Sequence, residues 1–101
     1  MIVPWNFPLV TSAWKLAPAL AAGCTVVLKP SDITPLIEQT YGQIADALGL
    51  PPGVLNIVGG KAEVGAALSN HAGIDKLSFT GSNAVGSQVM RSSAAHCRPV
   101  T

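Results

Sequence analysis

The chain has 101 residues, of which 49% are hydrophobic and only 11% are charged, and its formal net charge at pH 7 is +1. This length suits one small domain. The near-zero net charge, without a run of like charges, argues against a nucleic-acid-binding surface and against a patch for anionic membranes. Average domains carry about 25% charged residues, so we expect mostly covered faces and a fragment of a larger protein.

No part of the sequence indicates a membrane anchor, a secretory signal or a metal site. The longest apolar stretch, residues 16–28, is shorter than the ~18 residues of a membrane span, and the first residues, MIVPWNFP, lack a basic leader. Cys24 and Cys97 are too few for a disulfide scaffold and lack metal-ligand spacing. This usage favours a reducing compartment, the cytoplasm or alternatively an organelle matrix. We expect Cys24, which leads into an apolar strand, to be a buried structural thiol.

The first third of the chain predicts one helix and one strand. Pro8 suits the first turn of a helix. The apolar residues that follow at four-three-four spacing predict a helix up to Gly23, with a kink at Pro18. The β-branched, apolar run at residues 25–28 then predicts a buried parallel strand.

A second helix and a second strand are expected in the middle of the chain. Thr34 as the N-cap and Pro35 at the first helical position predict a helix that ends at Gly49. Residues 54–58 predict the second strand.

The last third predicts two more helices and two more strand segments. A short helix is expected over residues 63–69 and a strand over residues 76–79. Ser82 is a candidate N-cap for a helix that runs to about Ala95, and residues 99–101 begin another strand. Strands that alternate with helices predict an α/β fold with a doubly wound, mostly parallel sheet.

Doubly wound sheets bind ligands beyond the carboxyl ends of their strands, which directs attention to residues 29–32, 59–65 and 80–82. At the last of these corners, Gly81 allows a ligand to approach the backbone, and Ser82 begins a helix whose N-terminus favours an anion. A plain capped turn is the alternative. No lysine follows Gly86 as in a P-loop, so triphosphate hydrolysis is disfavoured. The dinucleotide-binding fingerprint G-x-G-x-x-G is absent as well.

Two further groups of residues carry chemistry. Lys29 and Asp32 follow the first predicted strand, where an ammonium and a carboxylate can hold a ribose diol. Alternatively, Lys29 is a solvated side chain and Asp32 supports the helix start at Thr34. The side-chain amide of Asn6, which lies within PWNFP, can donate to an oxyanion, although an ordinary turn asparagine is the other reading.

Four segments together resemble the coenzyme-binding region of the aldehyde dehydrogenase superfamily: PWNFPL, WKLAPALAAGCTVVLKPSDITP, GLPPGVLNIV and IDKLSFTGSNAVG. The resemblance covers essentially the whole chain, in the family's order and spacing. It implies a modified Rossmann fold that binds the pyrophosphate of NAD, with NADP as the alternative coenzyme. AGCTVVLKPS with GLPPGVLNIV is similar to plant-type betaine and amino aldehyde dehydrogenases.

The resemblance also implies roles for individual residues. It implies that Asn6 stabilises the oxyanion and that coenzyme contacts come from Val3, Pro4, Trp5, Lys29, Asp32, Gly65, Gly81, Ser82 and Val85. Asp32 stands where the family has glutamate, and one methylene less makes the grip on the ribose less secure. Gly65 would lie near the adenine, Ser82 at the pyrophosphate and Val85 against the adenine-side wall.

The family converts an aldehyde to a carboxylic acid with a cysteine nucleophile and a glutamate, and the resemblance implies that both lie outside these 101 residues. Residues 1–101 are thus expected to be part of the NAD-binding domain, inactive alone, without the catalytic domain. The expected partners are an aldehyde and identical subunits in a dimer or tetramer, with neither nucleic acid nor membrane. The alternative is a truncated, non-catalytic nucleotide-binding or interaction module.

Overall fold

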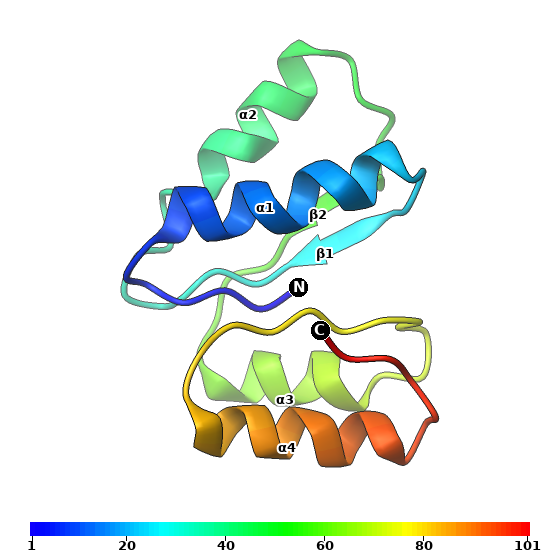
Figure 1. Cartoon of the computed structure of the whole chain (residues 1–101). Coiled ribbons are helices and arrows are strands. Elements are labelled where there is room, and N and C mark those ends of the chain that lie inside the picture. Colours follow the sequence, from blue (N-terminus) through cyan, green and yellow to red (C-terminus); the bar gives the residue numbers. More distant parts are fainter.

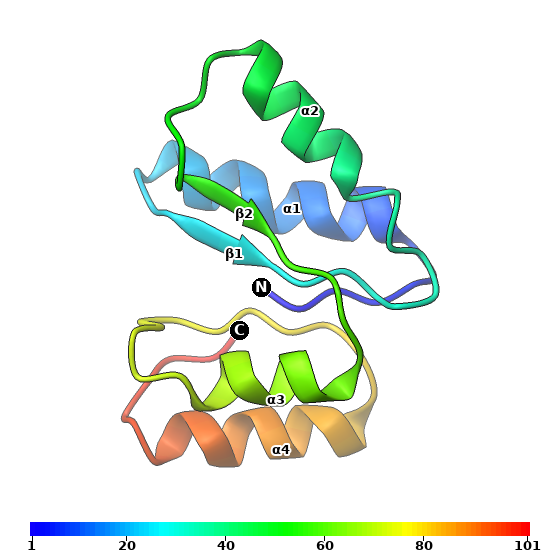
Figure 2. The same cartoon turned by 180° about the vertical axis from the view of Figure 1, so that it is seen from behind.

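A computed structural model describes all 101 residues of the chain (Figure 1). Its elements are α1 (Pro8–Ala21), β1 (Val26–Leu28), α2 (Gln39–Ala47), β2 (Leu55–Ile57), α3 (Ala62–Asn70) and α4 (Asn83–Ala94). The helices α1 and α2 lie on one side of the strands, and α3 and α4 lie on the other, as both views show (Figure 1 and Figure 2). The protein is therefore a layered α/β structure.

The strands and strand-like segments run parallel in an order that differs from their order in the chain. β1 and β2 pair in parallel, and isolated parallel bridges join Ile2 to Lys29, Ile2 to Phe79 and Leu77 to Val100. Across the molecule the order is therefore residues 55–57, 26–28, 1–3, 77–79 and 99–101. Counted along the chain this is three-two-one-four-five, the order of a doubly wound sheet, so the predicted fold class is confirmed.

The N-terminal segment is the central member of this array. The Ile2 amide donates to Ser78 O at 2.8 Å, and the Thr80 amide donates to Ile2 O at 3.1 Å. On the other side, the Val3 amide donates to Lys29 O at 3.2 Å. The reversal of strand order thus falls between residues 1–3 and 77–79, and doubly wound sheets bind ligands where this reversal occurs.

A small apolar core holds the α1 layer against β1. Leu16 of α1 is buried with Val3, Val26 and Leu28, and Leu28 has no exposed surface. All predicted helix ends except the start of the second helix lie within two residues of the observed ends. In particular, Gly23 has φ +79 just after α1, and Ser82 caps α4 by accepting a hydrogen bond from the Val85 amide at 3.4 Å.

The predicted start of the second helix is wrong. α2 begins at Gln39, and residues 35–38 form a turn, so Thr34 is not its N-cap. The Thr34 hydroxyl is buried without a hydrogen-bond partner, and the Thr34 amide donates to Ser31 O at 3.3 Å. The next amides bond three residues back, Thr40 to Ile37 O at 3.2 Å and Tyr41 to Glu38 O at 3.0 Å. Residues 35–38 therefore form a tighter turn, and the α-helix starts only at Gln39.

The expected burial of Cys24 is also wrong, because this thiol is exposed in the connection between α1 and β1. Apolar side chains are likewise less covered than the composition predicts. Only 13 of 101 residues are buried, and Trp14, Leu36 and Leu48 are 77%, 79% and 78% exposed. The low charge content therefore does not reflect a large internal core in this chain.

We expect the substitution Leu28→Ala to lower the free energy of unfolding by about 2–5 kcal/mol, because it leaves a cavity in the small core. The matched control is Leu48→Ala, where the same atoms are removed from an exposed side chain, and we expect a change within about 0.5 kcal/mol. Urea titration followed by circular dichroism measures both. Equal losses for the two variants would contradict the assigned core.

Candidate functional site

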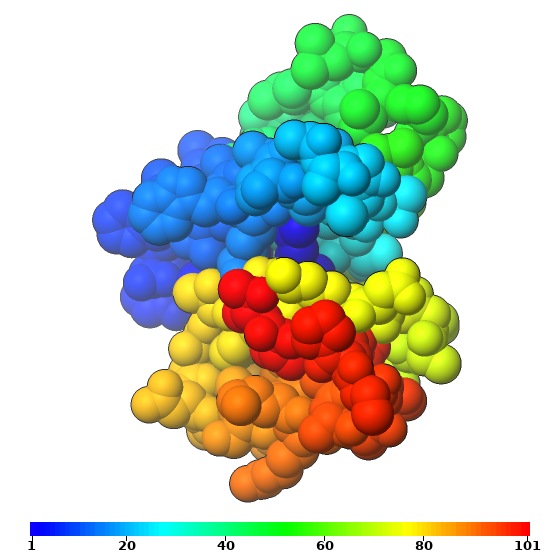
Figure 3. Space-filling view, turned by 45° about the vertical axis from the view of Figure 1, so that its right-hand side comes forward, coloured from blue at the N-terminus to red at the C-terminus, as the bar shows by residue number.

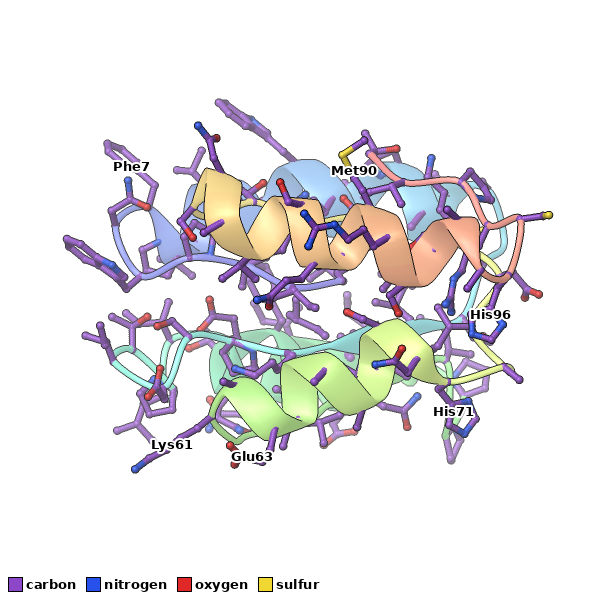
Figure 4. The ribbon with its side chains drawn as sticks, turned by 90° about the horizontal axis from the view of Figure 1, so that it is seen from below. Phe7, Lys61, Glu63, His71, Met90 and His96 are labelled. Carbon is purple, nitrogen blue, oxygen red and sulfur yellow. The ribbon has the colours of Figure 1, made fainter.

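The corners singled out in the sequence gather at one end of the molecule. Seen from below, Phe7 lies at the same end as Lys61 and Glu63, which mark the start of α3 (Figure 4). α4 also starts there, whereas His71 and His96 lie at the opposite end (Figure 4). This arrangement follows from the parallel strands, since their carboxyl ends meet at one edge.

An open depression of about 460 Å³ lies where the segment 77–79 passes into α4. It is lined by Phe79, Thr80, Gly81, Ser82, Asn83, Gly86, Ser87 and Met90. A Cβ atom on Gly81 would approach Phe79 Cζ to 2.6 Å, so the ring lies over the glycine as only glycine allows. The first backbone amides of a helix lack partners within that helix, which makes this depression suited to an anion.

Lys29 and Gly65 form a second corner next to the N-terminal segment. The Lys29 side chain is 6% exposed, and its ammonium donates to Pro30 O at 2.9 Å. A Cβ atom on Gly65 would lie 3.8 Å from Lys29 Cδ and 3.9 Å from Ile2 Cδ1. Gly65 of α3 thus faces the Lys29 side chain with room for no more than a small side chain between them, and Ile2 connects this corner to the neighbouring segment 77–79.

Most of the other predicted site residues are accessible, and none of them is held by a polar side-chain bond. Trp5 is 57% exposed, Val85 is 44% exposed, and Asn6 and Asp32 are exposed without a side-chain hydrogen bond inside the chain. Val3 is 3% exposed, and its side chain belongs to the core. The structure therefore places Lys29 and Gly65 side by side, while the side chains of Asn6 and Asp32 are exposed and unbonded.

Sequence reasoning missed part of the wall of the depression. Phe79, Asn83 and Met90 line it together with Ser87. The spacing of residues 83, 87 and 90 places them on one face of α4, so helical periodicity counted from Ser82 could have found three of the four. Phe79 gave no such signal, because its place over Gly81 depends on the strand-to-helix turn.

Two polar contacts between the α1 and α2 layers were also unforeseen. Ser12 Oγ donates to Glu38 Oε1 at 3.3 Å, and the Tyr41 hydroxyl donates to Leu9 O at 2.6 Å. Burial raises the pKa of the Glu38 carboxyl above its ordinary value. Burial, together with the neighbouring Glu38, raises the pKa of Tyr41. The sequence shows that Leu9 and Ser12 are three residues apart, as are Glu38 and Tyr41. It does not show that these two sets bond to each other.

A groove of about 650 Å³ lies elsewhere, between α1 and the segment that leads into residues 77–79. Met1, Trp14, Lys15 and Cys24 are among its lining residues, and Figure 3 looks onto the hollow with the blue N-terminal atoms at its floor. Lys15 Nζ donates to Ser78 Oγ at 2.6 Å, and burial lowers the pKa of this ammonium. The groove contains none of the predicted site residues.

No group of three or more histidine, cysteine, aspartate or glutamate side chains is arranged to hold a metal ion. None of the helices is long and apolar enough to cross a membrane.

The sequence profile of the aldehyde dehydrogenase family matches residues 1–101. This chain belongs to the aldehyde dehydrogenase family. It is 53% identical to the chloroplastic betaine aldehyde dehydrogenase of Beta vulgaris and 49% identical to the peroxisomal aminoaldehyde dehydrogenase 2 of Pisum sativum. In both cases the match covers 100% of this chain and 20% of the relative, so the chain spans about a fifth of these aldehyde dehydrogenases.

Solved aldehyde dehydrogenases have the same fold over this region. A variant of the Bacillus cereus aldehyde dehydrogenase is 50% identical with a TM-score of 0.96, over 99% of this chain and 21% of that one. The Staphylococcus aureus betaine aldehyde dehydrogenase, solved in complex with NAD+, is 40% identical with a TM-score of 0.94, over 98% and 20%. The modified Rossmann fold implied by the sequence resemblance is therefore confirmed.

We expect Gly81→Ala to displace the Phe79 ring, because the added Cβ would lie 2.6 Å from Phe79 Cζ. The control is Gly86→Ala, whose Cβ would lie at an ordinary 3.5 Å from Phe79 Cε1 and whose alanine should stabilise α4 by about 1 kcal/mol. NMR shifts of the Phe79 ring measure the displacement in both variants. An unmoved ring in Gly81→Ala would contradict the described depression.

Proposed function

We propose that this chain supplies the coenzyme-binding corners of an NAD-dependent enzyme that oxidises an aldehyde to a carboxylic acid, and that Asn6 stabilises the oxyanion there. The observation that carries the proposal is the meeting of the Lys29–Gly65 corner and the Ser82 turn on the two sides of Ile2, where the strand order reverses. Membership of the aldehyde dehydrogenase family supports it, as does the complex of the Staphylococcus aureus relative with NAD+.

The depression at Ser82 fits a diphosphate. Ser82 caps α4 with its own hydroxyl, and the remaining amides of the first turn point outward with the positive end of the helix dipole. Gly81 adds no side chain to this turn, and the Phe79 ring takes the space where a Cβ atom would lie. Val85 is 44% exposed beside this turn and offers an apolar surface for the adenine side of the coenzyme.

The Lys29 corner fits the adenosine ribose. An ammonium has three donors, and the bond to Pro30 O uses one of them, so two can reach ribose hydroxyls. Asp32 follows in the exposed turn and would accept from the same diol. Its carboxylate would also repel the 2′-phosphate of NADP, so NAD is the favoured coenzyme. Backbone groups of Val3, Pro4 and Trp5 would meet the coenzyme beside this corner, and Gly65 leaves room for the adenine.

Asn6 acts on the substrate in this proposal. Its amide is exposed and donates to no group of the chain, so both N–H bonds are free for the aldehyde oxygen. Donation there stabilises the negative charge that develops when a nucleophile adds to the carbonyl carbon. Bound NAD accepts the hydride in the oxidation. We assign the nucleophilic cysteine and the base to the part of the protein beyond these 101 residues, since Cys24 lies by the other groove.

The substrate that the relatives favour is a betaine aldehyde or an aminoaldehyde, since proteins with these names share 53% and 49% identity with the chain. We further propose that residues 1–101 are part of the NAD-binding domain of a homodimer or homotetramer. The exposed apolar side chains of Trp14, Leu36 and Leu48 support the presence of covering polypeptide. The cytoplasm stays a prediction, and the chloroplastic and peroxisomal relatives support the alternative of an organelle matrix.

The complete reading frame that carries this chain, expressed and assayed with NAD and aldehydes, tests the proposal. We expect oxidation of betaine aldehyde or aminoaldehydes by the complete protein and none by residues 1–101 alone. A frame without the cysteine and glutamate segments, with NAD binding but no turnover, would instead support the non-catalytic nucleotide-binding module. A complete protein that neither binds NAD nor oxidises aldehydes would contradict both.

In the complete enzyme we expect Asn6→Ala to lower kcat by about 10²–10³-fold with a much smaller change in the KM for NAD, because the lost donor acts mainly in the transition state. Steady-state kinetics with varied aldehyde and varied NAD measure this. The matched control is Asn70→Ala, which removes the same amide at the far end of α3, where Asn70 donates to Ala66 O. Similar kcat values for the two variants would remove Asn6 from the mechanism.

We expect Asp32→Asn to improve the affinity for NADP relative to NAD by about tenfold, because the variant keeps the shape of the side chain but loses the repulsive charge. Fluorescence titration with both coenzymes gives the ratio. Asp46→Asn removes an exposed carboxylate from α2 instead and should leave the ratio unchanged. An unaltered ratio in Asp32→Asn would mean that Asp32 does not face the ribose.

A further inference from the structure

Glu38 is an unusual residue, because its side chain is 0% exposed and has no cation beside it. Oε1 accepts a hydrogen bond from Ser12 Oγ at 3.3 Å, while Oε2 is buried without a partner. A buried carboxylate without a counter-charge is costly unless it is neutral or relieved by movement. The proposed catalytic and coenzyme-binding roles make no use of this group, so its burial calls for another explanation.

Glu38 connects α1 to the start of α2. It lies directly before α2, and Tyr41 one turn later donates to Leu9 O of α1 at 2.6 Å. Ser12 and Leu9 are three residues apart on α1, as Glu38 and Tyr41 are three apart on the α2 side, so each pair shares one helix face. Two hydrogen bonds thus join α1 to the start of α2, and Figure 1 shows the two helices on the same side of the strands.

Each side of this bridge continues into one of the candidate corners. α1 starts at Pro8, two residues after Asn6. On the other side, the turn that holds Asp32 runs from the buried Pro30 through residues 35–38 to Glu38. No side-chain bond holds Asp32 itself. The amides of Ile33 and Thr34 donate to Ser31 Oγ at 3.2 Å and to Ser31 O at 3.3 Å, which shapes the turn around Asp32. The two ends of the turn are held by the buried Lys29 and Pro30 on one side and by Glu38 on the other.

We propose that Glu38 is a positioning residue for the coenzyme corner: its buried carboxyl joins the end of the Asp32 turn to Ser12 of α1 and so keeps Asp32 in register with the Asn6 loop. This inference rests on the proposed NAD-binding function. Glu38 does not touch the coenzyme, and it acts through the turn that carries Asp32.

The charge state of Glu38 makes this restraint depend on pH. Burial raises the pKa of the folded carboxyl above its ordinary 4.5, so the folded chain binds the proton more tightly than the unfolded chain. The contribution of Glu38 to the stability of the fold is therefore complete below about pH 4.5, and it is lost as the pH rises through the raised pKa. Tyr41 is the titratable side chain that faces Glu38 from α2, and from α1 the facing group is the uncharged Ser12.

The test uses the complete protein that carries this chain, as wild type, Glu38→Gln, Glu38→Ala and the control Asp46→Asn. Glu38→Gln keeps the acceptor for Ser12 but cannot ionise. The first readout, without coenzyme, is the urea midpoint between about pH 5 and about pH 8. We expect the wild type and Asp46→Asn to lose stability relative to Glu38→Gln as the pH rises.

The second readout is the dissociation constant for NAD, by fluorescence titration, with kcat measured alongside. We expect Glu38→Ala to weaken NAD binding by roughly fivefold while kcat changes less, since a lost buried hydrogen bond is worth about that factor. Glu38→Gln should restore the affinity and remove its decline at high pH. If Glu38→Ala fails to fold, the pH dependence of stability and of NAD affinity in Glu38→Gln, compared with Asp46→Asn, tests the inference.

Two results would overturn the inference. One is a Glu38→Gln protein with the same pH dependence as Asp46→Asn in both readouts, and the other is a folded Glu38→Ala protein with wild-type affinity for NAD. A wild type that binds no NAD yet shows the stability difference between Glu38→Gln and Asp46→Asn contradicts the proposed function instead. In that case the bond between α1 and the turn exists but positions no coenzyme.

Discussion

The hydrogen bonds that hold residues 1–3 between β1 and the segment 77–79 are the constraint on which the rest of the structure depends. Ile2 is bridged to Lys29 on one side and to Phe79 on the other, although these residues are far apart in the sequence. This insertion makes the first segment the centre of the parallel array and creates the reversal of strand order there. The α1–α2 layer and the α3–α4 layer are then attached to one backbone frame.

The candidate site follows from that frame with few additional contacts. Gly65 brings α3 onto Lys29, and Gly81 lets the Phe79 ring lie against the turn before α4. The residues proposed to touch the reacting groups, Asn6 and Asp32, are by contrast exposed and without side-chain bonds. The reach of these two side chains is therefore set by the backbone that carries them, and that backbone is positioned by the helices and turns next to it. Glu38 is important because it belongs to such an element.

The sequence predictions succeeded where a feature depends only on residues next to it in the chain, and failed where more distant residues decide it. The Ser82 cap was identified correctly because an N-cap needs only the three residues that follow it. Thr34 carried an equally good local signal and failed, because residues 35–38 form a turn and no helix amide reaches its hydroxyl. Cys24 was expected inside on account of the apolar strand that follows, yet β1 begins only at Val26, and two positions earlier the chain is in an exposed connection.

Short segments and their order were enough to identify the family, to place strands and helices alternately along the chain, and to select the corners worth examining. Only the tertiary structure decided that residues 1–3 form the centre of the sheet, that Gly65 meets Lys29, and that Ser12 meets Glu38. The members of each pair lie 26 to 77 residues apart in the chain and meet only when the chain folds. Residue 2 meets residue 79, residue 12 meets residue 38, and residue 29 lies beside residue 65. No spacing within a single helix or strand encodes those partners.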